Sequence, residues 1–216
     1  MSVEFEAADE SIASDLRAGL SALGLRIDEE QKGQLLRYLA LLEKWNRVYN
    51  LTAIREIRKM VSGHLLDSLA IVPHLQGRSV LDIGSGAGLP GIPIAIARTD
   101  LQVVLLDGNQ KKVAFMRQAL AELALRNASV VCERIERWQT QSKFDFIVSR
   151  AFAETAAFAR QSRRLLAHGG VIAAMKGLHP HAEIEGLSED FSTVKVVALR
   201  VPGLAAARHL ALISPK

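Results

Sequence analysis

The sequence predicts an α/β protein, a doubly wound parallel sheet preceded by a helical N-terminal unit. Beyond residue 78, short apolar runs such as "SVLDIG" and "QVVLLD" alternate with amphipathic runs such as "KKVAFMRQALAELAL". This alternation is typical of parallel strands joined by helical crossovers. Before that point, apolar residues recur at the three- and four-residue spacing of helices. We therefore expect two parts, a helical region over residues 1–75 and an α/β domain over residues 76–216.

The N-terminal region contains three candidate helices. The stretch "DEEQKGQLLRYLALLEKWNRVYN" places five apolar residues on one helical stripe: Leu35, Leu36, Leu39, Leu42 and Trp45. Asp28, with Gln31 three positions on, is a candidate capping box for this helix. A second stretch, "EIRKMVSGHLLDSLAIVPHL", repeats the pattern and is expected to stop near Pro73. The weaker "AADESIASDLRAGLSALGL" predicts an earlier helix that ends at Gly24.

Composition narrows the class of protein. The 216 residues are 49% hydrophobic and 23% charged, which is typical of a globular chain. No apolar run approaches the roughly 20 residues of a membrane span, and the acidic "MSVEFEAADE" resembles no targeting peptide. A single cysteine, Cys132, fits a reducing compartment, so we expect a cytoplasmic protein. The first 30 residues are acidic and the rest is basic, which indicates either a polyanionic partner or merely solvated faces.

The stretch "LDIGSGAGLPGIP" follows the first predicted strand and indicates a ligand site. Gly84, Gly86 and Gly88 form a D-x-G-x-G-x-G pattern, unlike the G-x-G-x-x-G of dinucleotide folds, and no Lys-Ser/Thr pair closes a phosphate loop. Asp82 would repel a phosphate but suits a cationic ligand. Asp107 ends the next strand, where a carboxylate can accept both hydroxyls of a ribose. An adenosine with a cationic amino-acid tail and no phosphates is S-adenosyl-L-methionine.

These features together predict a class I (Rossmann-like) S-adenosylmethionine-dependent methyltransferase with a mostly parallel seven-stranded sheet. The fourth strand, "FDFIVSRAF", ends in Ser149 and Arg150 rather than in the N/D-P-P-Y/F stretch used for amino groups on bases. Cys132 stands in apolar company in the third strand and is expected to be a small core residue rather than a nucleophile. The scattered histidines have no carboxylate partner at ligand spacing, so we expect no metal site.

An acceptor with a free lone pair, such as guanine N7, remains. Its attack on a sulfonium methyl is an in-line displacement that needs no general base, so catalysis can rest on position and electrostatics. Arg150 is our candidate catalytic residue, since its guanidinium could hold the methionine carboxylate or orient the guanine edge. The alternative interpretation is that this arginine caps a buried carbonyl or pairs with Asp145.

Several segments, in this order, resemble the glucose-inhibited division protein B family: "KWNRVYNLTAIR", "HLLDSLAI", "LDIGSGAGLPGIPIAI", "LLDGNQKKVAFMR", "ERIE", "FDFIVSRAFA", "AMKG" and "RHL". The resemblance covers residues 43–210. Proteins of that family methylate guanine N7 in small-subunit ribosomal RNA. The resemblance implies cofactor contacts at Gly84, Leu89, Ile135, Glu136 and Arg150. It also makes Arg134 and Lys176 candidates for contact with RNA or acceptor.

The N-terminal region carries further candidate RNA contacts around "WNRVYNLTAIREIRK": Lys44, Arg47, Arg55, Arg58 and Lys59. Trp45, Tyr49 and Met60 fall at helical spacing, so we expect them in the core. Under this reading, the partner is 16S ribosomal RNA in the small subunit or an assembly intermediate, and the protein acts as a monomer. A small-molecule methyltransferase, a dinucleotide oxidoreductase and a non-catalytic, cofactor-binding RNA chaperone remain as alternatives.

Overall fold

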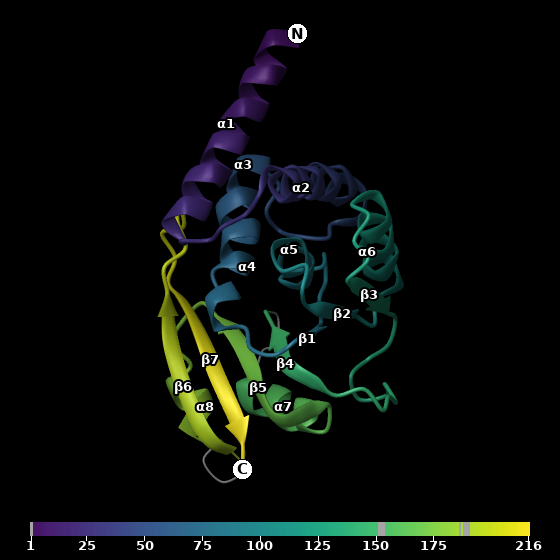
Figure 1. The fold of residues 1–216 in the computed structure, drawn as a ribbon, viewed down its shortest axis with the longest axis vertical. Coiled ribbons are helices and arrows are strands. Elements are labelled where there is room, and N and C mark those ends of the chain that lie inside the picture. Colours follow the sequence, from purple (N-terminus) through teal and green to yellow (C-terminus); the bar gives the residue numbers. More distant parts are fainter. Residues whose placement is uncertain (1, 151–153, 186, 188–190) are drawn as a thin grey trace.

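A seven-stranded sheet in the order β3-β2-β1-β4-β5-β7-β6 forms the centre of the molecule (Figure 1). The computed structural model describes residues 2–150, 154–185, 187 and 191–216. The strands are β1 (Ser79–Ile83), β2 (Gln102–Leu106), β3 (Ala128–Val131), β4 (Phe144–Ser149), β5 (Leu166–Lys176), β6 (Phe191–Leu199) and β7 (Arg208–Pro215). Strands β1 to β5 are parallel, whereas β7 runs antiparallel between β5 and β6. The predicted doubly wound, mostly parallel sheet is therefore confirmed.

Helices cover both faces of this sheet. They are α1 (Ser2–Ala22), α2 (Glu29–Tyr49), α3 (Ile57–Met60), α4 (Asp67–Leu69), α5 (Gly91–Ala97), α6 (Gln110–Glu122), α7 (Thr155–Arg163) and α8 (His181–Glu185). A π-helical turn, η1 (Val61–Leu66), joins α3 to α4, and a 3₁₀ turn, η2 (Val72–His74), follows α4. One core packs the N-terminal helices, α5 and α6 against one face of the sheet, and a second core packs α7 against the other (Figure 1). None of the described helices is long and apolar enough to cross a membrane.

The predicted N-terminal helices are confirmed with one difference. Asp28 and Gln31 form the expected reciprocal capping box of α2, and Gly24 follows α1 with a φ of +67°. The stretch over residues 56–75 is not one regular helix, because η1 interrupts it. An extra residue in a π-helical turn rotates the side chains that follow. Nearly all side chains of residues 60–72 are buried, polar His64 and Asp67 among them.

Helix α2 is attached directly to the glycine-rich turn. The buried Tyr38 hydroxyl donates a hydrogen bond to the Ala87 carbonyl at 2.7 Å, and Gln31 donates to Ile96 at the end of α5 at 2.8 Å. Apolar side chains on both sides of residue 75 thus share one core. The division into two domains at this residue stays a prediction.

Two expectations about individual side chains were wrong. Strand β3 ends at Val131, so Cys132 lies beyond it and is exposed rather than part of the core. Met60 is buried and Trp45 is partly buried as expected, but Tyr49 is 44% exposed because it is the last residue of α2. Its ring lies against Trp45 with the two ring centroids 5.1 Å apart.

Candidate active site

The first cavity of the site lies where three neighbouring strands end together. Ile83, Leu106 and Val131 are in register across β1, β2 and β3, so the turns that follow them meet at one edge of the sheet. We call the hollow between these turns the Asp107 cavity; its volume is about 180 Å³. It is lined by Ile83, Gly84, Leu106, Asp107, Gly108, Glu133, Arg134, Ile135 and Glu136. The structure thus brings five predicted residues together: Gly84, Asp107, Arg134, Ile135 and Glu136.

The glycines of the turn after β1 serve two different purposes. Gly84 and Gly86 have φ values of +69° and +60°, and a Cβ on Gly84 would point into open space. A Cβ on Gly88 would lie 2.3 Å from Ile92, and one on Gly91 would lie 2.2 Å from a Leu105 methyl. The latter two glycines therefore allow α5 to pack closely on the sheet. The former two leave room in which a ligand can approach the backbone.

Asp107 holds this turn in place. Its carboxylate accepts hydrogen bonds from the backbone N–H of Gly86 and of Asn109, both at 2.8 Å. Each carboxylate oxygen has a further lone pair available. Asp107 can therefore still accept ribose hydroxyls at the edge of the cavity, as the sequence predicts.

Asp82 lies beneath the turn as a fully buried carboxylate. One oxygen accepts the Gly91 N–H at 2.9 Å, whereas the other, Oδ1, has no hydrogen-bond partner among the described residues. Burial raises the pKa of Asp82 to about 7, although hydrogen bonds from Gly91 and Ser85 and the charge of Arg150 oppose the rise. A buried acceptor without a partner costs free energy unless a ligand pairs with it. The residues present thus fit the cationic amino group of the predicted cofactor.

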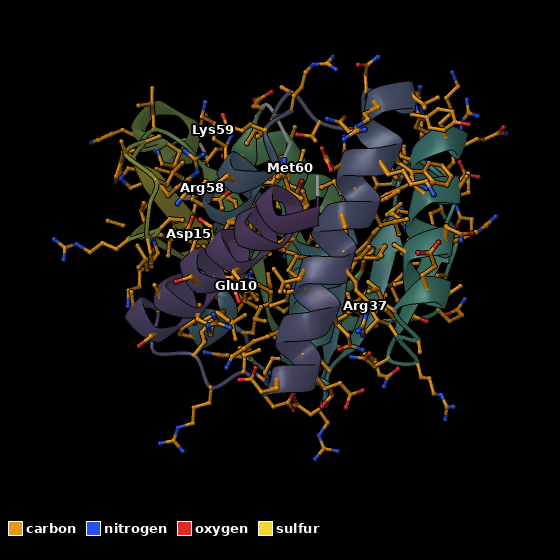
Figure 2. The ribbon with its side chains drawn as sticks, turned by 90° about the horizontal axis from the view of Figure 1, so that it is seen from above. Glu10, Asp15, Arg37, Arg58, Lys59 and Met60 are labelled. Atoms are coloured by element: carbon orange, nitrogen blue, oxygen red, sulfur yellow. The ribbon has the colours of Figure 1, made fainter. Side chains whose placement is uncertain are left out.

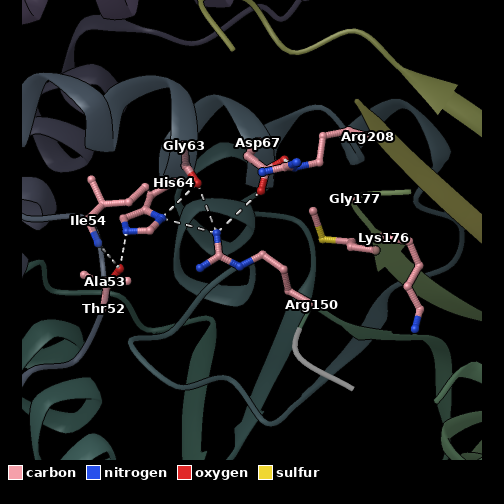
Figure 3. A pocket seen from close by; sticks show the side chains of 11 residues that line it. Thr52, Ala53, Ile54, Gly63, His64, Asp67, Arg150, Lys176, Gly177 and Arg208 are labelled. Atoms are coloured by element: carbon pink, nitrogen blue, oxygen red, sulfur yellow. Dashed lines mark hydrogen bonds and ion pairs between the residues drawn. The ribbon is translucent and has the colours of Figure 1, made fainter. Parts of the chain in front are cut away.

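The second cavity, of about 340 Å³, surrounds Arg150, and we call it the Arg150 cavity (Figure 3). Four parts of the chain line it: residues 52–54, the η1–α4 segment, the end of β4, and the paired ends of β5 and β7. In this last pair Lys176 of β5 lies in register with His209, which places Arg208 and Lys176 at the same edge. Most of the charges that line the cavity are positive.

A polar network fixes these charges. Arg208 donates to the buried Asp67 carboxylate at 2.9 Å, and Arg150 lies 3.5 Å from the other oxygen of that carboxylate. Arg150 also donates to the Gly63 carbonyl at 3.3 Å. The alternative pairing with Asp145 is wrong, because that carboxylate accepts the backbone N–H groups of residues 78 and 79.

His64 completes the network from η1. Its ring forms a 2.8 Å hydrogen bond with the Thr52 hydroxyl, and its other nitrogen lies 3.3 Å from Arg150. Burial, together with the charge of Arg150, lowers the pKa of His64 to about 4. The imidazole is therefore neutral at physiological pH.

The remaining predicted residues are dispersed. Leu89 is buried in the core beside the turn, and Lys176 forms a 2.6 Å ion pair with Glu183 at the Arg150 cavity. Arg58 pairs with Asp15 of α1 at 2.8 Å (Figure 2). The other candidate RNA contacts lie around the end of α2 or just beyond it: Lys44, Arg47 paired with Glu43, Arg55 bonded to Asn50, and Lys59 paired with Glu56. Contact with RNA by these residues stays a prediction.

Sequence reasoning missed four polar residues of the Arg150 cavity: Thr52, His64, Asp67 and Arg208. All four lie within the resembling segments "NLTAIR", "HLLDSLAI" and "RHL", but no role was assigned to them. The available signal was a histidine and an aspartate three residues apart within an otherwise apolar helical pattern. Buried polar residues need partners, so such a pair indicates a polar cavity.

Comparison with known proteins supports the resemblance. The model of the rRNA small subunit methyltransferase G (GidB) family matches residues 31–211. The chain belongs to this family. Ribosomal RNA small subunit methyltransferase G from Laribacter hongkongensis is 52% identical over 93% of this chain and 97% of its own. The protein of that name from Chromobacterium violaceum is 53% identical over 91% and 95%.

Solved structures of low identity show the same fold. A ribosomal protein L11 methylase from Lactobacillus delbrueckii subsp. bulgaricus has a TM-score of 0.55 at 21% identity, covering 70% of this chain and 77% of its own. The tRNA (m1A58) methyltransferase TrmI from Aquifex aeolicus has a TM-score of 0.56 at 14% identity, over 70% and 68%. The predicted class I S-adenosylmethionine-dependent methyltransferase is thus confirmed by the fold and by membership of the rRNA small subunit methyltransferase G family.

Proposed function

We propose that this methyltransferase transfers a methyl group from S-adenosyl-L-methionine to N7 of a specific guanine in 16S ribosomal RNA. One observation carries the proposal: the open turn at Gly84 and the Asp107 carboxylate line one cavity, directly after the strand that carries buried Asp82. Burial raises the pKa of Asp82, and the charge of Arg150 is among the effects that oppose the rise. A carboxylate and a guanidinium match the ammonium and carboxylate of an amino-acid tail.

The residues present define how the cofactor is held. Asp107 accepts the ribose hydroxyls, Ile135 and Glu136 flank the adenine, and the backbone at Gly84 lies against the tail. Asp82 pairs with the ammonium and Arg150 with the carboxylate, which gives the buried Asp82 carboxylate and the partly buried Arg150 guanidinium a charged partner each. When bound, the cofactor supplies an electrophilic methyl on a sulfonium. The protein's contribution is to hold that methyl in line with the acceptor and to exclude water.

The Arg150 cavity favours an acceptor that needs no base. His64, with a pKa of about 4, is a weak base at neutral pH. Both oxygens of Asp67 already face arginines, Arg208 and Arg150, although burial raises the pKa of this carboxyl. Guanine N7 has a lone pair in the plane of the ring, so its attack requires no proton abstraction. The cationic lining also suits an RNA substrate, whose phosphates carry negative charge.

Methyl transfer to purified small ribosomal subunits that lack the modification tests this function. We expect labelled methyl from S-adenosylmethionine to appear at one guanine, located by chemical cleavage specific for N7-methylguanine. Incorporation at another atom would contradict the proposed acceptor. An absence of incorporation, with cofactor binding intact, would contradict the RNA substrate and favour the small-molecule alternative.

A further inference from the structure

The described part of the chain has three exposed large apolar side chains, and all three are close in the chain to residues that line the Arg150 cavity. Val48 is 69% exposed, Tyr49 44% and Leu178 82%. Val48 and Tyr49 end α2, three or four residues before the cavity wall begins at Thr52. Leu178 directly follows Gly177, a lining residue on another segment.

These two segments lie on different sides of the cavity. Figure 3 shows residues 52–54 on one side of Arg150 and Lys176 with Gly177 on the other. Scattered exposed apolar residues are ordinary on a protein surface. Here the three are close in the chain to the cationic lining of one cavity, and this combination of apolar and cationic side chains points to a binding role.

The end of α2 is fixed relative to the cavity. Buried Asn46 donates to the Ile54 carbonyl at 3.1 Å and accepts the Thr52 N–H at 2.9 Å, which ties α2 to the cavity wall. Tyr49 lies against Trp45, whose ring in turn packs edge-on against Phe115 of α6 with centroids 5.6 Å apart. The Tyr49 ring therefore packs on one side against Trp45, while its other side is exposed to solvent.

The segment that carries Leu178 is also held. His209 of β7 forms a 3.2 Å hydrogen bond with the Gly177 carbonyl, and its ring packs against His179 with centroids 5.3 Å apart. Leu178 therefore projects between anchored neighbours rather than from a free loop.

The positive charges near these apolar side chains indicate which kind of ligand binds there. Lys44, Arg47 and Arg55 surround the end of α2, and Arg208 with Lys176 lies beside Leu178. Aromatic and apolar side chains among cations are the usual combination for unpaired nucleic acid, because bases stack on the rings while cations contact phosphates. A duplex keeps its bases stacked and offers them no free faces.

We infer that the mouth of the Arg150 cavity binds an unpaired RNA segment, with Tyr49 and Leu178 contacting bases on its two sides. The inference rests on the proposed function for the identity of the polymer. It goes beyond that function in two respects: the RNA segment is bound as a single strand, and Tyr49 and Leu178 contact its bases.

Binding of a fluorescein-labelled oligoadenylate to the full chain tests this, with the same strand annealed to oligouridylate as the duplex probe. Replacing one stacking side chain costs a single-strand complex roughly tenfold in affinity. We expect that loss for Tyr49→Ala and for Leu178→Ser, with duplex affinity and the salt dependence of binding unchanged. Tyr49→Phe and Leu178→Met, which keep the apolar surface, serve as matched controls and should bind as the parent protein does.

Unchanged single-strand affinity in both truncated variants, or an equal loss for duplex, would overturn the inference and would show that this patch serves another partner, such as a protein. A methyl-transfer assay on small subunits separates this failure from failure of the proposed function. If the parent protein transfers methyl groups and the variants bind the single strand as the parent does, only the inference is overturned. If the truncated variants lose single-strand affinity but the parent transfers no methyl group, the inference is supported and the proposed reaction is overturned.

Discussion

The Asp107 cavity and the Arg150 cavity are built in different ways. The former takes all its residues from the turns after three adjacent strands, within residues 83–136. The latter joins residues 52–54 to a π-helical turn, to the end of β4 and to Arg208 near the C-terminus. The proposed cofactor side of the site is thus a local property of the α/β fold, whereas the proposed acceptor side depends on contacts between distant segments.

The chemistry of the two cavities differs correspondingly. Carboxylates and glycines dominate the Asp107 cavity, which suits hydroxyls and close approach to the backbone. Cations dominate the Arg150 cavity, with Asp67 as the buried acid between two arginines. Arg150 belongs to both sides, because its charge also acts on Asp82 beneath the glycine turn. We therefore expect changes on each side to affect different ligands.

The largest effect is expected for Asp82→Asn in the protein without cofactor. The folded-state pKa of Asp82 is raised from 3.8 to about 7, so its stability contribution is present below pH 3.8 and is lost as pH rises through 7. Since one pKa unit corresponds to about 1.4 kcal/mol, the variant should gain up to about 4 kcal/mol relative to the parent between pH 4 and pH 8. Urea unfolding at pH 4 and at pH 8 measures the unfolding free energy of both proteins. If this free energy changed with pH equally in the parent and in the variant, Asp82 would not be a buried carboxylate with a raised pKa.

The second prediction concerns Arg150→Ala, which should weaken binding of the amino-acid tail of the cofactor but not of its adenosine part. Loss of a partner to a buried carboxylate costs about 3 kcal/mol, so affinity for S-adenosylmethionine should fall about 100-fold. Methylthioadenosine lacks the amino-acid tail, and its affinity should not change. Calorimetric titration with both ligands measures the difference, with Arg150→Lys as the variant that keeps the charge. Equal losses for both ligands would place Arg150 away from the tail.

A third prediction uses two glycines with matched backbone strain. Gly84 and Gly24 have φ values of +69° and +67°, and a Cβ on either would meet no atom within 4 Å. Substitution by alanine should therefore cost each protein about 1 kcal/mol of unfolding free energy. Only Gly84→Ala should also weaken cofactor binding, by roughly 30-fold, or about 2 kcal/mol, because its methyl would occupy ligand space. Equal cofactor affinity in the two variants would show that the turn does not hold the ligand.

The smallest effect is expected on the RNA side, for the triple variant Arg55→Ala, Arg58→Ala and Lys59→Ala. Arg58 and Lys59 already pair with carboxylates, so their contribution to phosphate binding is reduced. RNA affinity should fall about tenfold at low salt with a shallower salt dependence, while cofactor affinity stays the same. Filter binding over a salt series measures both quantities. Unaltered RNA affinity would remove this region from the RNA-binding surface.

The Asp107 cavity could be predicted from sequence because its signals are local. The D-x-G-x-G-x-G turn and a carboxylate after the next strand specify a ligand edge once the strands are parallel. The Cys132 expectation was wrong for a related reason. Strand β3 lies at the edge of the sheet and none of its residues is fully buried, so apolar neighbours in the sequence did not place Cys132 in the core.

The Arg150 cavity could not be predicted in the same way. Periodicity predicts a regular helix over residues 56–75, whereas η1 interrupts it and His64 and Asp67 are buried with polar partners from distant segments. The position of Arg208 depends on the antiparallel register of β7 against β5, which no local pattern specifies. Tyr49 was assigned to the core by its spacing, but spacing does not show that the helix ends at this residue.

The division of ligands between the two cavities is tested most directly by titrating Asp107→Ala and Arg208→Gln, each with S-adenosylmethionine and with small-subunit RNA. We expect Asp107→Ala to lose cofactor affinity but keep RNA affinity, and Arg208→Gln to lose RNA affinity but keep cofactor affinity. Asp100→Asn, a matched change near the start of β2, should alter neither. Equal loss of both ligands in either cavity variant would contradict the assignment of one ligand to each cavity.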